Sequence, residues 1–339
     1  GRHPESTVFS VRKGGIMSEY LLEIRDLQVQ YPIKRDKILD PNRVLKAVDG
    51  VSFHVAEGET FGIVGESGCG KTTTGKAIVK LVTPTGGKIF YRDRDIYDHP
   101  SKAEEFSYRR KLQIIFQDPF SSLDPRFTVG RTIGEPHEIH KMGTKAERKE
   151  RIYELMNEVG LKKEQFTRFP HEFSGGQRQR IGIARALSLQ PELIVCDEPV
   201  SALDVSIQAQ ILNLMKDLQE KHSLTYVFIS HNLSVVKHIC NRIGVMYLGN
   251  FVEIASSEEI FSHPLHPYTN GLLEAIPVPD PEKPSLSAGL EGDVPSPISP
   301  PSGCVFHTRC KFCMEKCKNE KPTLKEVAPG HFVACHREV

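Results

Sequence analysis

The sequence has almost no net charge and lacks a hydrophobic run long enough to cross a lipid bilayer. Its 44 basic residues balance 43 acidic ones, so a formal charge of +1 gives no support for a nucleic-acid polyanion as the main partner. A spanning helix needs about 18 consecutive apolar residues. The longest apolar runs, in PELIVCDEP and LTYVFISH, have only the length of buried strands. If the protein works at a membrane, we expect a peripheral subunit.

A secretory leader is also missing from the start of this sequence. The first 16 residues, GRHPESTVFSVRKGGI, contain no apolar h-region. We interpret Met17 as the natural start and residues 1–16 as an expression remnant or an upstream extension outside the fold. Without a leader, Cys69, Cys196 and Cys240 are expected to be reduced thiols, and the cysteines clustered near the end of the chain favour metal binding over disulfides.

What the sequence does contain is an alternation of strand and helix patterns. With 339 residues, 39% of them hydrophobic, it has room for two domains or for one domain with an appendage. Residues 21–31 alternate like a strand, and residues 47–64 predict two strands around a turn at 57–59. Apolar runs predict two further strands, at 191–197 and 224–230. Helical spacing predicts helices at about 101–112, 144–159 and 205–221 and from 233 onward. The alternation favours a doubly wound α/β core.

The stretch GESGCGKT, residues 65–72, fits the phosphate-loop pattern G-x-x-x-x-G-K-[ST]. It follows the apolar segment FGIV and precedes a helical segment, a context that argues against a chance glycine turn. The glycines let backbone N–H groups curl around phosphate oxygens, and the helix N-terminus faces the anion. We expect Lys71 to reach the β- and γ-phosphates of a nucleotide and the Thr72 hydroxyl to hold Mg²⁺.

An apolar strand in LIVCDEP, residues 193–199, ends in two acidic residues. Asp197 is placed to hold Mg²⁺, directly or through water. Glu198 is then the candidate that polarises an attacking water. The alternative, an ordinary strand-end turn or helix cap, loses weight when a phosphate loop is present in the same chain.

A second glycine motif, SGGQ in EFSGGQRQR, opens another predicted helix at residues 174–177. Ser174 could act only as a helix N-cap. Gly175 and Gly176 would be poor choices for that role alone, because each glycine costs helix stability. Bare N–H groups at a helix start suit a second phosphate-binding surface better.

The order of these motifs resembles that of ATP-binding-cassette ATPases. The phosphate loop, IIFQDP with Gln117, SGGQ, LIVCDEP, SALD with Asp204 and FISH with His231 follow one another over about residues 20–260. The resemblance implies a P-loop cassette domain over 17–275, with a RecA-like core, an antiparallel β subdomain and a helical subdomain at about 120–188. It also implies that ATP is bound by Tyr31, Gly65, Ser67, Gly68, Cys69, Gly70, Lys71, Thr72 and Thr73.

In that family two cassettes bind head to tail, and each ATP lies between the phosphate loop of one and the SGGQ of the other. The resemblance therefore places residues 174–177 on the partner's nucleotide and Asp204 at the dimer interface. Tyr31 would stack on adenine or be ordinary strand packing, because the insertion at 32–46 lengthens the usual spacing to the loop. The catalytic residues of this Mg²⁺-dependent ATPase would be Lys71, Gln117, Glu198 and His231, with Gln117 also sensing Mg²⁺ and the membrane subunit.

Three longer stretches narrow the resemblance to ATPase subunits of dipeptide and oligopeptide importers: AVDGVSFHVAEGETFGIVGESGCGKT, FQDPFSSLDPRFTVGRTIGEP and HPLHPYTNGLLEAIPVPDP. SSLDPRF and the insertion after Tyr31 look like the second ATPase of such a pair. The resemblance implies a peripheral protein on the cytoplasmic face of the cell membrane, with a second cassette, identical or unlike, two permeases and an extracytoplasmic binding protein as partners. Nickel and glutathione importers stay open as alternatives. A soluble cassette with a nucleic-acid-binding metal tail is disfavoured, because lysines and glutamates are mixed in that tail.

Five of the eight cysteines lie near the end of the chain, four in GCVFHTRCKFCMEKC at 303–317 and one in VACH. Taken alone, Cys310-x2-Cys313-x3-Cys317 has a spacing like that of iron–sulfur sites, and a zinc site that could include His307, His331 or His336 is the alternative. The importer resemblance instead selects Cys304, Cys310, Cys317 and Cys335 as ligands of a [4Fe–4S] cluster and leaves Cys313 surplus. We expect residues 276–339 to form a proline-rich linker and a small metal-binding domain whose metal folds a segment too short to build a core.

Overall fold

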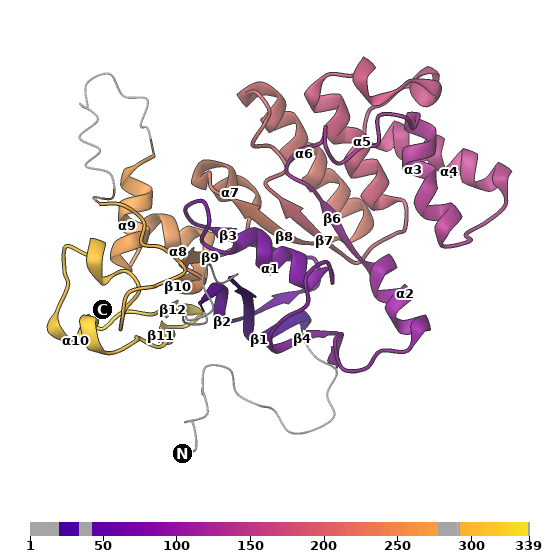
Figure 1. The fold of residues 1–339 in the computed structure, drawn as a ribbon. Coiled ribbons are helices and arrows are strands. Elements are labelled where there is room, and N and C mark those ends of the chain that lie inside the picture. The colour runs from indigo at the N-terminus through magenta and orange to yellow at the C-terminus, as the bar shows by residue number, and fades with distance from the viewer. Residues whose placement is uncertain (1–19, 34–42, 277–289, 291, 338–339) are drawn as a thin grey trace, which may run out of the picture.

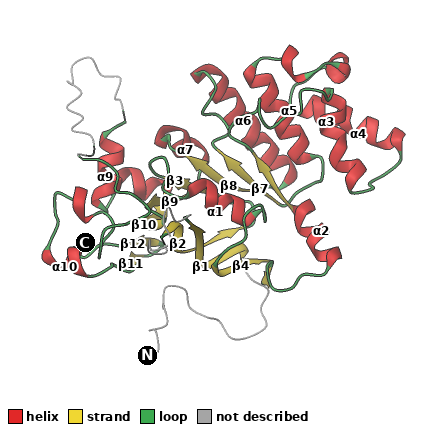
Figure 2. Ribbon diagram, in the orientation of Figure 1, coloured by secondary structure: helices red, strands yellow, loops and turns green. Residues whose placement is uncertain are grey.

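The computed structural model describes residues 20–33, 43–276, 290 and 292–337 of the chain (Figure 1). Residues 1–16, most of the insertion after Tyr31 and nearly all of the proline-rich stretch 276–286 lie outside the described residues. The predictions made for those three segments stay predictions. The described strands form two sheets, with helices packed around them (Figure 2).

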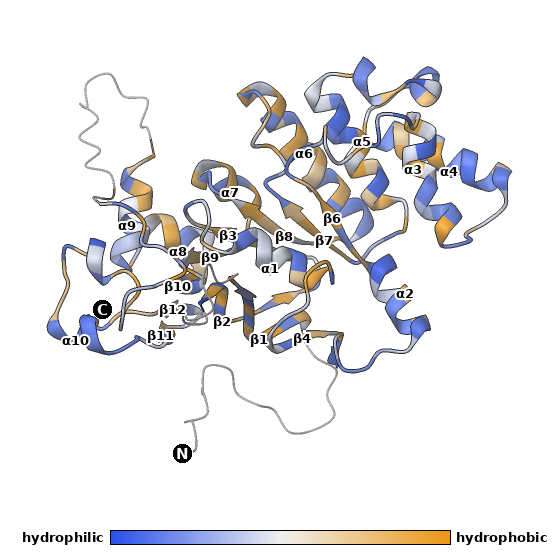
Figure 3. Cartoon of the chain, in the orientation of Figure 1, coloured by the Kyte–Doolittle hydropathy of each residue, from blue (hydrophilic) through white to orange (hydrophobic). Residues whose placement is uncertain are grey.

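The larger sheet has eight strands in the order β11-β12-β10-β9-β3-β8-β7-β6. These strands are β3 (Thr60–Val64), β6 (Leu112–Ile115), β7 (Leu193–Asp197), β8 (Thr225–Ser230), β9 (Arg242–Tyr247), β10 (Asn250–Ser256), β11 (Lys325–Ala328) and β12 (His331–Val333). The five strands from β9 to β6 run parallel, and every residue of β3, β7 and β8 is buried. Burial on both faces explains why these strands are continuous apolar runs. In Figure 3 the hydrophobic strands of this sheet contrast with helices α2 and α10 at the periphery, which are mostly hydrophilic.

The smaller sheet is antiparallel, in the order β2-β1-β4-β5. Its strands are β1 (Tyr20–Pro32), β2 (Val44–Ala56), β4 (Gly86–Tyr91) and β5 (Arg94–Asp95). The prediction of a strand at 21–31 and of two strands around a turn at 57–59 is confirmed, since β2 ends at Ala56 and β3 begins at Thr60. Gly58 lies in that turn with φ of +73°, a conformation that glycine adopts readily.

Helices pack on the larger sheet and extend beyond it at one end, where α3, α4 and α5 lie together (Figure 1). The helices are α1 (Lys71–Ile78), α2 (Lys102–Lys111), α3 (Val129–Ile139), α4 (Lys145–Glu158), α5 (Gly175–Leu187), α6 (Val205–His222), α7 (Leu233–Ile239), α8 (Ser257–Ser262), α9 (Pro267–Glu274) and α10 (Glu315–Asn319), with short 3-10 turns at Lys163–Thr167, Pro170–Glu172 and His307–Arg309. None of the described helices combines the length and hydrophobicity that crossing a bilayer requires.

Helix α1 lies close against the sheet because of a glycine on its buried face. A Cβ at Gly75 would lie 2.7 Å from Ile229 Cδ1 and 2.8 Å from Val195 Cγ1. These two contacts come from neighbouring strands, β8 and β7. The missing side chain therefore brings the start of α1 close to the carboxyl ends of both strands, which is where the site is built.

The cysteine tail is continuous with the cassette rather than a separate core. β12 pairs with β10, with Val333 opposite Glu253 and Phe332 opposite Ile254. The side chains of Cys304, Phe306 and Cys317 belong to the same buried cluster as the central strands. We had expected a metal to fold a segment too short for its own core, but in the structure the sheet of the cassette supplies that core.

A buried contact between a histidine and a glutamate fastens the tail to β10. His331 Nε2 lies 2.8 Å from Glu253 Oε1, and the side chains are 4% and 0% exposed. The Glu253 carboxylate also accepts hydrogen bonds from the backbone N–H groups of Leu265 (2.8 Å) and His266 (3.0 Å). A buried carboxylate with three partners is well satisfied, so this contact holds β12 and the segment before α9 in one arrangement.

Candidate active site

The phosphate loop joins the end of β3 to the start of α1, as the sequence predicted. Gly65 and Gly70 have φ of +153° and +107°. A Cβ at Gly65 would lie 2.1 Å from the Met246 carbonyl oxygen, and one at Gly70 would lie 2.2 Å from the Ala47 carbonyl oxygen. Both positions therefore require glycine. Gly70 is also the N-cap of α1, so the first N–H groups of that helix are left open to an anion.

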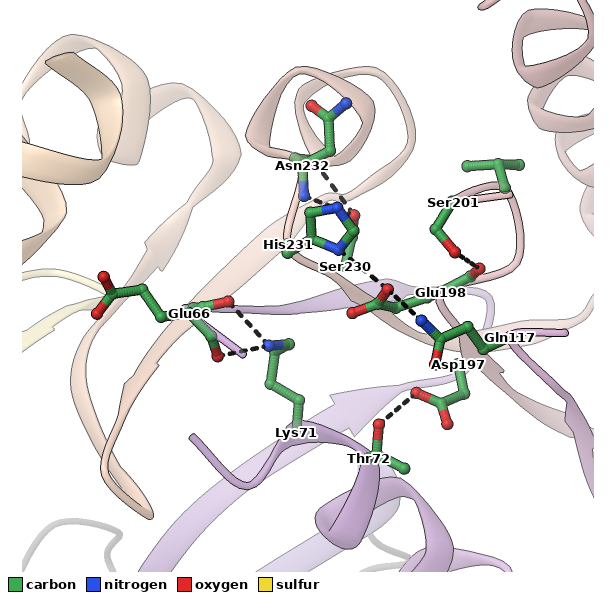
Figure 4. Close-up of polar contacts among 12 residues, drawn as sticks. Glu66, Lys71, Thr72, Gln117, Asp197, Glu198, Ser201, Ser230, His231 and Asn232 are labelled. Carbon is green, nitrogen blue, oxygen red and sulfur yellow. Dashed lines mark hydrogen bonds and ion pairs between the residues drawn. The ribbon is translucent and has the colours of Figure 1, made fainter. Parts of the chain in front are cut away.

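The Lys71 side chain lies inside the loop (Figure 4). Its Nζ donates hydrogen bonds to the carbonyl oxygens of Gly65 (2.8 Å) and Glu66 (2.9 Å), and the residue is buried. A positive charge therefore sits where the loop would hold phosphate oxygens. Five further residues predicted to bind the nucleotide lie in the same loop or in the first turn of α1, and they are Ser67, Gly68, Cys69, Thr72 and Thr73.

Of the three residues predicted to contact Mg²⁺, Thr72, Gln117 and Asp197, two are in direct contact with each other. Thr72 Oγ1 donates a 2.8 Å hydrogen bond to Asp197 Oδ1. Burial raises the pKa of Asp197, and the hydrogen bond from Thr72 opposes that shift. A hydroxyl and a carboxylate are hard oxygen ligands of the kind that Mg²⁺ prefers, and a cation there would favour the ionised carboxylate. The donor set fits the predicted ion.

Glu198 lies between two of the other predicted catalytic residues (Figure 4). Gln117 Nε2 donates to Glu198 Oε2 over 2.9 Å, and His231 Nδ1 lies 2.9 Å from the same oxygen. The three residues follow β6, β7 and β8, which are neighbours in the parallel sheet. Because the carboxyl ends of parallel strands meet at one edge of the sheet, residues far apart in the sequence converge there.

The backbone of Glu198 adopts a conformation that no sequence pattern predicts. Its φ is +47°, in the left-handed region that non-glycine residues rarely adopt. The backbone N–H donates to the Ile229 carbonyl oxygen (3.0 Å), and the Glu198 carbonyl oxygen accepts from the Ser201 hydroxyl (3.1 Å). Such backbone strain is typical of sites where a side chain must be aimed at a fixed point.

The SGGQ motif opens α5, and the structure shows how it is held. Ser174 and Gln177 form a capping box, in which the Ser174 hydroxyl accepts from the Gln177 N–H and the Gln177 side chain accepts from the Ser174 N–H (3.1 Å). Ser174 and Gly175 are exposed, whereas Gly176 is buried. Within the described part of the chain, no hydrogen bond joins this motif to the phosphate loop. The structure of one chain thus supports the capping role, and the contact with a partner's nucleotide stays a prediction.

Two further predicted residues are placed but not tested in their proposed roles. Asp204 is the N-cap of α6, where its carboxylate accepts from the Ile207 N–H (3.0 Å) and the Ser206 hydroxyl (2.7 Å). The hydrogen bond from Ser206 lowers the pKa of Asp204. Tyr31 lies near the end of β1 with 38% of its surface exposed, so its ring is accessible.

The tail cysteines are gathered, but in the part of the chain that the structure describes they are not arranged as a preformed metal site. Cys304 N–H donates to the Cys317 carbonyl oxygen (2.8 Å). Burial raises the pKa of the Cys304 thiol to about 11, and the nearby thiols of Cys317, Cys335 and Cys310 push it in the same direction. The four predicted ligands are therefore neighbours. Yet the described residues contain no group of three or more His, Cys, Asp or Glu side chains placed to hold a metal ion. The structure thus gives no support to a [4Fe–4S] or zinc site.

The three histidines considered as zinc ligands are engaged elsewhere. His307 Nδ1 lies 2.9 Å from the Cys304 carbonyl oxygen, and His336 Nε2 lies 2.9 Å from the Glu320 carbonyl oxygen. The remaining one, His331, is paired with a carboxylate of β10 as described above. Each contact uses one ring nitrogen and leaves the other for a possible ligand. None of the three, however, belongs to a group of three or more potential metal ligands among the described residues.

The sequence motifs missed the residues that surround the phosphate loop from the C-terminal side. The Glu66 N–H donates to the Tyr268 hydroxyl (2.9 Å), and the Glu66 carboxylate accepts from Arg309 of the tail. These residues are 202 and 243 positions apart from Glu66. Both partners lie in stretches that carry the importer resemblance, but a single sequence holds no signal for which residues so far apart contact each other.

Two known families match the chain. The ABC transporter family matches residues 48–201, and the oligopeptide/dipeptide transporter C-terminal region matches residues 252–317. The chain is 53% identical to the oligopeptide transport ATP-binding protein AppF of Bacillus subtilis (strain 168), over 94% of this chain and 97% of that protein. A putative peptide import ATP-binding protein of Brucella ovis is 51% identical, over 94% of this chain and 98% of that protein.

Solved structures share the fold. The dimeric ATP-binding cassette MJ0796, in a post-hydrolysis state with ADP and Pi, matches with a TM-score of 0.61 and 27% identity, over 70% of this chain and 98% of that one. The cbiO1 protein of Clostridium perfringens, part of the ABC transporter complex cbiONQ, matches with a TM-score of 0.62. Its identity is 23%, over 73% of this chain and 92% of that one, so it bears on the fold alone.

Proposed function

The chain belongs to the ATP-binding-cassette (ABC) transporter family of ATPases, and from this premise we propose that it hydrolyses ATP to drive the import of dipeptides or oligopeptides. Relatives named as oligopeptide transport and peptide import ATP-binding proteins, at 53% and 51% identity, support peptide as the solute. The observation that carries the ATPase proposal is the Glu198 carboxylate, held between Gln117 and His231 beside the phosphate loop.

The strand-end residues act on the γ-phosphoryl group by positioning and charge neutralisation rather than by covalent chemistry. Glu198 orients and polarises the attacking water, and Gln117 and His231 fix its carboxylate for that task. Lys71 exchanges its two carbonyl partners for phosphate oxygens and neutralises part of their charge. When bound at Thr72 and Asp197, Mg²⁺ draws charge from the phosphate oxygens.

A second cassette completes this site. The SGGQ motif is exposed at Ser174 and Gly175, with its start of α5 available to a nucleotide held by another chain. The relative MJ0796 was solved as a dimer, which supports the same arrangement here. Asp204 then lies at the interface, Tyr31 stacks on adenine, and hydrolysis requires the dimer.

The importer comprises this chain, a second cassette of the same or an unlike sequence, two permeases and an extracytoplasmic binding protein. The chain is a peripheral subunit on the cytoplasmic face of the cell membrane and is the second ATPase of its pair. Residues 17–275 form the cassette domain, with the helical subdomain at about 120–188. Residues 276–339 form the linker and the small cysteine domain docked on β10.

The function is tested by transport in proteoliposomes that contain the chain with its permeases and partner cassette. We expect uptake of a radiolabelled dipeptide or tripeptide that requires ATP on the cassette side and the extracytoplasmic binding protein on the other. Uptake of nickel or glutathione without peptide would move the chain to a sibling branch of importers. Nucleic acid that co-purifies with the chain, in place of a permease, would contradict the transport function.

We also propose that Cys304, Cys310, Cys317 and Cys335 hold a [4Fe–4S] cluster once the metal is present. The proposal rests on the importer resemblance. The other three thiols lie near Cys304, whereas the described residues show no preformed ligand arrangement, which weighs against it. The test is the content of iron, acid-labile sulfide and zinc in anaerobically purified protein, with its visible spectrum. Zinc without sulfide would mean that the thiols form a zinc site and not a cluster. If neither iron nor zinc is found, the cysteines are reduced thiols without a metal.

A further inference from the structure

The tail reaches the phosphate loop through Arg309. Its two terminal nitrogens, Nη1 and Nη2, donate to Glu66 Oε2 (2.7 Å) and Oε1 (3.1 Å), which makes the pair bidentate. The Arg309 side chain is 4% exposed and that of Glu66 is 26% exposed. A bidentate pair with so little exposure holds one geometry and is weakly screened by salt. The second residue of the loop is thereby tied to the C-terminal tail.

Glu66 is fixed at every polar group it has. Its N–H donates to the Tyr268 hydroxyl (2.9 Å), and its carbonyl oxygen accepts from Lys71 Nζ (2.9 Å). Its carboxylate is held by Arg309. Because the carbonyl oxygen of the same residue binds the ammonium that would neutralise phosphates, a shift of the Glu66 side chain would move the Lys71 ammonium as well.

Arg309 is itself anchored by the core of the cassette. Phe306 is buried, and its ring centroid lies 5.3 Å from that of Tyr247 and 5.4 Å from that of Tyr268. The Arg309 N–H donates to the Phe306 carbonyl oxygen (3.0 Å), and its guanidinium lies 5.9 Å from the Tyr247 ring centroid. The aromatic cluster therefore fixes both ends of the contact, with Tyr268 bound to the Glu66 backbone.

The charge of the pair matters as much as its geometry. A carboxylate at the second position of a phosphate loop repels the anion that the loop must hold. The Arg309 guanidinium is always protonated and neutralises that carboxylate from the side of the tail. The expected result is a loop whose net charge, with Lys71 included, stays positive.

We propose that Arg309 is a positioning residue for nucleotide binding, through which the C-terminal tail sets the affinity of the phosphate loop for ATP. This inference rests on the proposed ATPase function. Arg309 acts through Glu66 and touches neither Glu198 nor its two neighbours in any contact of the described residues. Substitution of Arg309 is therefore expected to weaken ATP binding, while the rate at which bound ATP is hydrolysed stays nearly unchanged.

The test compares MgATP binding and hydrolysis in the full chain, assembled with its partner cassette and permeases, for the wild type and Arg309→Met. We expect the dissociation constant and KM for ATP to rise about tenfold, within the range usual for coupling between sites. The kcat should stay within about twofold of the wild type. The double variant Arg309→Met/Glu66→Gln should recover most of the affinity, because removing the carboxylate removes the uncompensated charge.

Lys321→Met is the matched control. Lys321 also joins the tail to the cassette by an ion pair, with Nζ 3.0 Å from Asp49 Oδ2, but Asp49 lies on β2 and not in the phosphate loop. We expect ATP affinity to be unchanged in this variant. If Arg309→Met does not fold, Arg309→Lys keeps the charge, loses the bidentate fork and should still raise KM, by about threefold.

Three outcomes would overturn the inference. They are an unchanged KM in a folded Arg309 variant, an equal rise of KM in Lys321→Met, and a fall in kcat without a change in affinity. A wild-type assembly that neither binds nor hydrolyses ATP would instead remove the proposed function, so the two failures are distinguishable.

Discussion

At the carboxyl ends of β6, β7 and β8, the side chains of Gln117, Glu198 and His231 already touch one another, and Thr72 touches Asp197 close by. In the tail, five cysteines lie between residues 304 and 335. Cys310, Cys317 and Cys335 are near Cys304, and Cys313 is near Cys310. None of the described side chains there adopts an arrangement that could hold a metal. The sequence motifs predicted a functional site in both regions. Only in the first are the predicted side chains already in contact without a ligand.

The difference lies in what fixes each side chain. The residues of the first region follow buried parallel strands, so hydrogen bonds and packing of the sheet set their positions before any ligand arrives. The cysteines lie on irregular backbone and on the short helix α10, where a metal would normally supply the missing order. A motif at the end of a strand therefore predicts how its side chains are arranged. A motif in an irregular segment predicts only which residue types are present.

Glu198→Gln tests the assembled region and should have the largest effect. The amide keeps the shape of the side chain but cannot polarise the attacking water. We expect kcat for ATP to fall at least about 100-fold, as for other general bases, while ATP binding is retained. Steady-state hydrolysis and equilibrium binding measure the two quantities.

Glu220→Gln is the control for that experiment, because Glu220 is an exposed acid of α6. Its turnover should match the wild type. Normal turnover in Glu198→Gln would take Glu198 out of the role of general base, and with it the main support for the assembled site.

Cys310→Ser tests the tail in the same way. If iron and acid-labile sulfide are found at about four each per chain, this substitution should remove most of both, because a [4Fe–4S] cluster needs four cysteine ligands. Cys313→Ser is the matched control and should retain the cluster. Loss of iron in Cys313→Ser, with retention in Cys310→Ser, would show that the ligand set was assigned wrongly.

His331→Ala tests whether the cassette, and not a metal, holds the tail. The substitution removes the imidazole that lies 2.8 Å from the buried Glu253 carboxylate, and we expect it to lower the free energy of unfolding by about 3 kcal/mol. Urea unfolding of the metal-free protein gives the value. His263→Ala, which removes an exposed histidine 3.6 Å from Glu259, should change stability by less than about 0.5 kcal/mol. Equal values for both would mean that the buried pair does not fasten the tail.

Gly75→Ala tests the packing beneath the assembled region and should have the smallest effect. The added Cβ would crowd Ile229 and Val195, so we expect a loss of about 1–2 kcal/mol in stability. Gly182→Ala in α5 is its opposite, because a Cβ there meets no atom within 4 Å. Helix propensity should make that variant about 0.5–1 kcal/mol more stable. If thermal unfolding showed that both substitutions change the stability in the same direction, this account of α1 would be contradicted.

The strands and the phosphate loop could be predicted because their signals are local. Apolar runs, a turn at Gly58 and the pattern at residues 65–72 each identify themselves within a few positions. The contact between Thr72 and Asp197 agrees with the prediction that both hold the same Mg²⁺, and that role stays a prediction. The contacts of Glu66 with Tyr268 and Arg309 could not be found, because they depend on tertiary packing between distant segments.

The tail shows a second limit of sequence reasoning. Its short, proline-rich composition suggested a segment that needs a metal to fold, and nothing in the residues showed that β12 would pair with β10. Phe306 looks like any other aromatic residue in the sequence, yet it packs on Tyr247 and Tyr268 in the core. When a C-terminal segment packs on the core of a neighbouring domain, its own amino-acid composition does not reveal how much ordered structure it forms.

The pairing of β12 with β10 also bears on solubility. β10 is buried from Phe251 to Ala255 and, apart from Glu253, apolar. Without the tail its outer edge would offer unpaired N–H and C=O groups to any other strand. In the structure the outermost strand is instead β11, which is short, exposed and charged at Lys325 and Glu326. Short charged edge strands discourage edge-to-edge association. The cysteine tail thus shields the molecule from self-association, whether or not it ever holds a metal.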